Sequence, residues 1–157
     1  MKEFNALKWL CLLSFIGFLY CFVLDTRFCL AFAEASLDLD KVEDWLRDLI
    51  EYWQENGFAF DEEVKDQLVK FYAIRIVFDV LAMVGVCLMY FKIKLGWTFY
   101  LIFQLAYVIS PFMLLNFEFE PQWPYLSGFA VFVVPLFSGM IHLIYVLLFL
   151  SQKKNLR

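Results

Sequence analysis

The chain has 157 residues, enough for one compact domain, and 63% of them are hydrophobic, against roughly 45–50% in soluble domains. The net charge is −4 and there is no basic patch, which excludes the electrostatic footprint of a nucleic-acid-binding protein. The composition therefore favours an integral membrane protein, with the lipid bilayer as one of its partners.

The cysteines argue against redox and metal chemistry. Cys11, Cys21, Cys29 and Cys87 form no CxxC pair, and the first three lie in one apolar segment. On a helix their separations become about 12–15 Å, too far for a disulfide. A zinc site lacks its cysteine spacing and its histidines, and no phosphate loop or nucleophile elbow occurs. We therefore expect no cofactor, no metal and no catalytic residue.

The first apolar stretch, residues 9–33, is long enough to cross a bilayer as a helix. Its charged start and the triplet Ala31-Phe32-Ala33 are also typical of a signal peptide. The apolar run is long for that role, however, and Asp25 and Arg27 precede the would-be cleavage site. We expect an uncleaved membrane anchor, with a cleaved signal as the alternative.

An acidic segment follows. Residues 34–70 hold twelve acids and four bases, a net charge of −8. Between Val42 and Trp53, hydrophobic residues recur at i, i+3, i+4, i+7, i+8 and i+11, which predicts an amphipathic helix over residues 37–56. The polar face is too charged to cross a membrane, so this helix should lie outside the bilayer.

The ends and the apolar face of this helix also leave signals. Asp40 followed by Glu43 resembles a capping box, and Gly57 is a plausible C-terminal stop. The apolar face includes Trp45, Leu49 and Trp53. It serves either as a lid on the chain's own bundle or as a contact surface for a partner.

The second span, residues 71–91, continues a helix that begins outside the membrane. Asp61 is a good N-cap, and Glu62 and Glu63 suit the positive end of a helix dipole. We therefore expect one helix from Glu62 to about Tyr90. The third span is predicted over residues 97–116 and the fourth over residues 125–150.

Basic residues set the topology. They fall at the two termini and in the turn between spans two and three: Lys2, Lys8, Lys92, Lys94, Lys153, Lys154 and Arg157. Because basic loops stay inside, both termini should be cytoplasmic, and a bacterial inner membrane fits the short loops. Glycine is scarce and no GxxxG occurs, so large side chains should fill the bundle.

The predicted fold is therefore an all-α integral membrane protein. It has four transmembrane helices in a single domain covering residues 1–157, with an amphipathic extracytoplasmic helix between spans one and two, inside the helical segment 37–70.

Four ionisable residues within the predicted spans form the first candidate site. Asp25, Arg27, Arg75 and Asp79 should all lie in the outer half of the membrane. Unpaired charges there are costly, so we expect the two acids and two bases to pair, with Arg75 and Asp79 on one helix face. The cluster is either a clamp between spans one and two or a polar pocket that opens to the outside.

The second candidate site is a polar stripe at mid-depth. On spans three and four, polar residues recur at i, i+4 and i+7: Tyr100, Gln104 and Tyr107, and Ser138, His142 and Tyr145. Hydrogen bonds between helices are their expected role.

No sequence motif identifies a reaction. We therefore carry three hypotheses for the function of the chain. The first is a non-enzymatic subunit or scaffold of a larger membrane assembly, whose partners are other membrane proteins or further copies of the chain. The second is a small homo-oligomeric channel or transporter that uses the intramembrane charges. The third is a membrane enzyme that acts on lipid or quinone.

Overall fold

The computed structural model describes residues 6–55, 59–114 and 144–151. Throughout these ranges the regular structure is helical and no strand occurs, which confirms the all-α class there. The named helices are α1 (Ala6–Glu34), the 3-10 helix η1 (Leu39–Lys41), α2 (Asp44–Glu55), α3 (Glu62–Tyr90) and α4 (Lys94–Leu114). A further helical segment covers residues 144–151.

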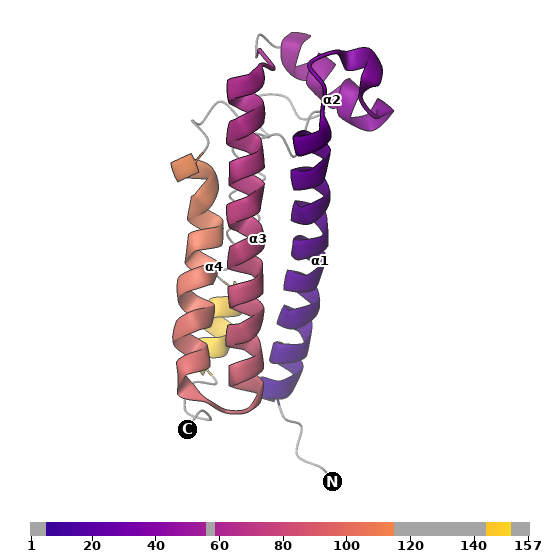
Figure 1. Ribbon diagram of the computed structural model, residues 1–157. Helices are drawn as coiled ribbons and strands as arrows, with labels where there is room; N and C mark the ends of the chain where they lie inside the picture. Colours follow the sequence, from indigo (N-terminus) through magenta and orange to yellow (C-terminus); the bar gives the residue numbers. More distant parts are fainter. Residues whose placement is uncertain (1–5, 56–58, 115–143, 152–157) are drawn as a thin grey trace.

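Helix α3 is central to the arrangement, because it packs against both α1 and α4 (Figure 1). Helix α3 runs antiparallel to both α1 and α4, and α2 lies across the end where α1 finishes and α3 begins (Figure 1). At 1.5 Å per residue, the 29 residues of α3 extend about 43 Å, more than the ~30 Å core of a bilayer.

The facing sides of α1 and α3 follow a heptad-like spacing. The buried positions of α3 include Leu68, Tyr72, Arg75, Asp79, Ala82, Val86 and Met89. Those of α1 are Leu7, Cys11, Ser14, Phe18, Asp25 and Phe32. Steps of three and four residues keep one stripe turned toward a neighbouring helix, as in left-handed bundles. Three charged residues therefore occupy core positions of this packing seam.

Two apolar clusters lie at opposite ends of the seam. At the α2 end, Phe32 and Tyr72 pack with α2. At the other end, Cys11, Val86 and Phe149 belong to one cluster, and Phe149 of the segment 144–151 packs on Tyr100 of α4 with ring centroids 4.7 Å apart. The buried charged residues fall between the two clusters along both α1 and α3.

The predicted bounds of α3 are confirmed. The Asp61 side chain accepts a hydrogen bond of 2.9 Å from the Val64 N–H, as an N-cap should. At the other end, the Ile93 N–H donates to the Leu88 carbonyl at 2.9 Å and Lys92 to Met89 at 2.8 Å. This is a Schellman motif, and Lys92 accordingly has a φ of 63°.

The predicted start of the amphipathic helix is wrong. Residues 37–56 do not form one helix, since η1 ends at Lys41 and α2 begins only at Asp44. Val42 between them is extended and buried, so its side chain packs into the core instead of continuing the helix. The Glu43 carbonyl accepts the first hydrogen bonds of α2. Glu43 was predicted to lie in the first turn of the helix, as the second residue of a capping box, but it instead immediately precedes α2.

Glycine contributes more to the packing than its scarcity suggests. A Cβ on Gly96 would lie 2.6 Å from the Gly85 carbonyl oxygen and from the Met89 nitrogen. A Cβ on Gly85 would lie 2.6 Å from the Tyr100 nitrogen. The backbones of α3 and α4 therefore touch beside their turn. The expectation that large side chains fill the bundle is therefore wrong beside this turn. The sequence did not signal the contact, because the two glycines lie on different helices and form no GxxxG motif.

Two described helices, α1 and α3, are long and apolar enough to cross a membrane. Helix α1 contains the first predicted span, and α3 contains the second except for Phe91. The third span coincides largely with α4, and most of the fourth, residues 125–150, lies outside the described residues. The count of four spans stays a prediction.

We predict that Gly96→Ala destabilises the chain by about 1–3 kcal/mol, because the added methyl meets backbone atoms that no rotamer change can move. Gly17→Ala is the matched control, since a Cβ there meets nothing within 4 Å. Thermal unfolding in detergent, followed by circular dichroism, compares the two. Equal midpoints would contradict the close approach of α3 and α4.

Candidate functional site

An ion pair links α1 to α3 in the middle of the seam. Arg75 Nε donates to an Asp25 carboxylate oxygen at 3.0 Å. Arg75 is 6% exposed and Asp25 is 2% exposed, so the pair is shielded from the surroundings. Charges in such a place are retained only when they are paired and hydrogen-bonded.

A tyrosine of α4 completes the surroundings of this pair. Arg75 Nη2 donates to the Tyr107 hydroxyl, which also lies close to Asp25. The guanidinium carbon lies 4.2 Å from the centroid of the Tyr107 ring and 5.1 Å from that of Phe71. Ring faces attract a cation, so the guanidinium is held by a carboxylate of α1, a hydroxyl of α4 and aromatic faces of α3 and α4.

Asp79 is the most enclosed charged residue of the cluster. It is 0% exposed, and neither of its carboxyl oxygens has a donor among the described residues. The predicted Arg75–Asp79 ion pair is absent there, because Arg75 turns toward Asp25 on the neighbouring helix. Asp79 lies instead within hydrogen-bonding reach of the Asp25 carboxyl. We call Asp25, Arg75, Asp79 and Tyr107 the charge cluster.

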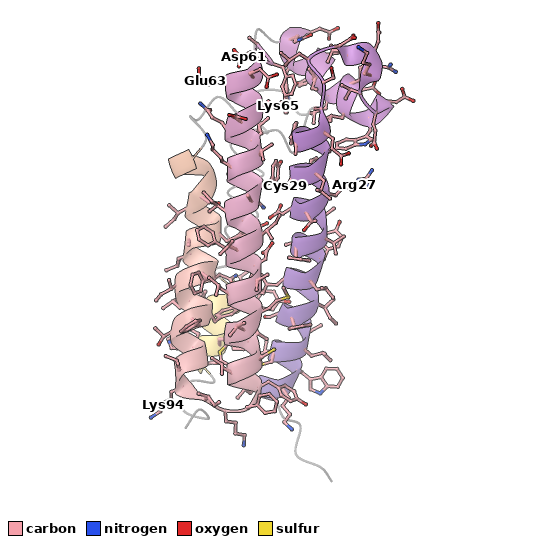
Figure 2. All side chains as sticks on the ribbon, in the orientation of Figure 1. Arg27, Cys29, Asp61, Glu63, Lys65 and Lys94 are labelled. Atoms are coloured by element: carbon pink, nitrogen blue, oxygen red, sulfur yellow. The ribbon has the colours of Figure 1, made fainter. Side chains whose placement is uncertain are left out.

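Arg27 does not belong to the charge cluster. It lies on the side of α1 away from α3 (Figure 2), with its guanidinium 5.2 Å from the Trp45 ring centroid. The reason is helical geometry, since residues two apart on a helix point about 200° apart. Asp25 and Arg27 therefore cannot both face α3, and the expected balance of two acids against two bases is wrong.

The polar stripe is described only in part. Tyr100, Gln104 and Tyr107 are all buried along α4. Tyr100 packs edge-on against Phe18 of α1, with ring centroids 6.0 Å apart. Tyr145 is half-buried in the segment 144–151, whereas Ser138 and His142 lie outside the described residues. Tyr107 thus belongs to the charge cluster more than to a separate stripe.

The apolar face of α2 packs on the chain itself. Leu49 and Trp53 are buried, and Trp53 stacks on Phe32 of α1 with centroids 6.1 Å apart. Trp45 contacts Phe28 of α1 edge-on at 5.6 Å. This face therefore forms a lid over the ends of α1 and α3.

One neighbour of the charge cluster gives little signal in the sequence. Cys21, one helical turn before Asp25, lies close to Tyr107 and Asp79. In the sequence, only the (i, i+4) spacing between Cys21 and Asp25 indicates that Cys21 lies near the cluster. Among the described residues, no group of three or more His, Cys, Asp or Glu side chains is arranged to hold a metal ion.

Comparison with models of protein families gives no match to this chain, and searches of curated proteins and of solved structures find none either. The geometry of the chain itself therefore carries the functional argument.

We predict that Asp25→Asn destabilises the fold by about 3–5 kcal/mol, because it leaves the Arg75 guanidinium buried without its carboxylate. The double variant Asp25→Asn with Arg75→Met should lose less than the sum of the two single losses, since it removes both charges. Asp48→Asn on the exposed face of α2 is the control and should stay within about 0.5 kcal/mol of wild type. Additive losses would show that the pair does not couple α1 to α3.

Proposed function

We propose that this chain is an integral membrane protein that serves as a non-enzymatic subunit of a larger membrane assembly. The observation that carries the proposal is a reversed polarity. Asp25, Arg75 and Asp79 are buried between the helices, whereas large apolar side chains of α1 point outward. The outward set is Trp9, Leu12, Leu13, Ile16, Leu19, Tyr20, Val23 and Leu30.

This polarity supports a bilayer as the surrounding medium. In a water-soluble fold, apolar helices of this length are core helices and are mostly buried. Here only 22% of the most apolar window of α1 and 39% of that of α3 are buried. A surface of this size and apolarity needs lipid or protein to cover it. The Asp25–Arg75 pair, held to α3, also supports α1 as a retained part of the fold and not a cleaved signal.

The two ends of the bundle differ in charge. Lys94 marks the end with the α3–α4 turn, and Asp61 and Glu63 mark the opposite end beside α2 (Figure 2). Lys8 belongs to the basic end, since its amino group lies 5.1 Å from the Tyr90 ring centroid. Under the positive-inside rule this supports a cytoplasmic basic end, cytoplasmic termini and, in our proposal, a bacterial inner membrane.

The outward face of α1 supports a protein partner in addition to lipid. Tyr20 is 65% exposed there, and about 18 Å of helix separate it from Lys8, which places its hydroxyl near the bilayer centre. A hydroxyl in hydrocarbon is costly without an acceptor, and membrane interfaces use small residues for close packing. Gly17, exposed on the same face with open space before it, would admit a partner helix.

The second candidate function is a small homo-oligomeric channel or transporter. The specific observation in its favour is the charge cluster, because ionisable groups inside membrane spans commonly mark ion and proton pathways. Its partners would be copies of this chain, and its functional residues would be Asp25, Arg75 and Asp79.

Cysteine labelling tests the membrane placement. In a chain with its native cysteines replaced by alanine, Glu63→Cys should react with a membrane-impermeant maleimide added to intact cells. Lys94→Cys should react only after permeabilisation, because the two residues mark opposite ends of the bundle. Labelling of both positions from the same side would contradict a membrane-crossing bundle.

The mass of the native complex tests the subunit role. After mild extraction from the native host, native mass spectrometry should show this chain with other membrane proteins. Gly17→Leu should release them, whereas Val84→Leu on the exposed side of α3 should not. A lone monomer would contradict the proposal, and a closed homo-oligomer would favour the channel or transporter.

A further inference from the structure

The charge cluster contains one carboxyl group more than its cation requires. Asp25 and Asp79 are both buried, with the single guanidinium of Arg75 beside them. With both carboxyl groups ionised, the buried site would carry a net charge of −1. An uncompensated charge in such surroundings is expensive, and a buried carboxyl group ordinarily becomes neutral by taking up a proton.

The two carboxyl groups are not equivalent. Asp25 is bonded by Arg75 Nε at 3.0 Å and lies within reach of the Tyr107 hydroxyl, so it has donors that stabilise a carboxylate. Asp79 is 0% exposed, and its oxygens meet no donor among the described residues. It lies within hydrogen-bonding reach of Asp25. Two carboxyl groups can form a hydrogen bond with each other only when one of them carries the hydrogen.

We propose that the charge cluster is a proton-binding site at which Asp79 carries one proton at neutral pH and donates it in a hydrogen bond to the Asp25 carboxylate. The proton converts the Asp79 carboxylate into a neutral acid, and no other bond changes. The site is then neutral overall, because Asp25 and Arg75 balance each other. The Asp25 carboxylate then accepts hydrogen bonds from both Arg75 and Asp79.

The groups that face Asp79 come from all three long helices. Asp25 and Cys21 face it from α1, Arg75 precedes it on α3, and Tyr107 approaches from α4. Arg75 is engaged by Asp25 and Tyr107, and it does not reach Asp79 as an ion-pair partner. A metal ion in place of the proton would need several oxygen ligands, and no group of three candidate side chains is present in the described part of the chain.

This inference deepens the candidate site and rests on the proposed membrane location. Failure of that location would show in the cysteine labelling, whereas failure of the inference would show in the spectra described next. The chain's aspartates make the test direct. It has eight of them, of which Asp25 and Asp79 are buried and the other six are exposed.

The experiment uses the full chain, labelled with ¹³C at the aspartate carboxyl carbons, in bilayers of phosphatidylcholine and phosphatidylglycerol at neutral pH. One of the eight carboxyl signals should have the chemical shift of a protonated acid. Asp79→Asn should remove that signal, and Asp66→Asn, an exposed site on the same helix, should leave it unchanged. Eight ionised signals, or a protonated signal that survives in Asp79→Asn, would overturn the proposal.

A stability comparison keeps the test decisive if a variant spectrum is not obtained. The wild-type chain should lose thermal stability as the pH is raised, because the proton leaves and a buried negative charge remains. Asp79→Asn, which keeps the shape of a neutral acid, should not show this loss. A pH-independent midpoint in the wild type would overturn the proposal, as would stabilisation by sodium over choline at constant ionic strength.

Discussion

The Asp25–Arg75 ion pair is the constraint on which the rest of the structure depends. It joins α1 and α3, whose outward surfaces are largely apolar and whose charged residues Asp25 and Arg75 are buried between them. A pair of this kind fixes which faces of α1 and α3 meet and at what register, because a shift of either helix would leave one charge without its partner. Tyr107 extends the same constraint to α4. The apolar clusters on either side then fill the remaining length of the seam.

The described helices expose apolar side chains and bury charged ones, and both ends of the buried seam are closed by packing. The lid made by α2 covers the acidic end of α1 and α3, so that the seam is closed above the charge cluster by aromatic side chains. The close approach at Gly85 and Gly96 closes the other end of the α3–α4 pair. Within the described part of the chain, this packing leaves a broad apolar face of α1 uncovered, and the subunit proposal rests on that face.

Residues with strong local signals were predictable. The bounds of α3 follow from the N-cap Asp61 and from the basic turn after Tyr90, both of which act within a few residues. The start of α2 was missed because the burial of Val42, a tertiary effect, overrides the local cap signal at Asp40. The place of Arg27 was open to prediction from the helical repeat alone. That Tyr107 meets Arg75 was not, because the stagger of α4 against α3 depends on their glycine contact, which no single-helix pattern shows.

The separation of Asp25 from Arg75 in the sequence has a consequence for how the protein is made. The two residues are 50 positions apart, so α1 is synthesised well before its partner on α3 exists. During that interval Asp25 lacks the guanidinium that it later binds, which raises the free-energy cost of placing this part of α1 in an apolar medium. In the membrane location proposed above, the Asp25–Arg75 pair can form only once α3 is present, so it stabilises the association of α1 with α3 and adds nothing to the insertion of α1 alone.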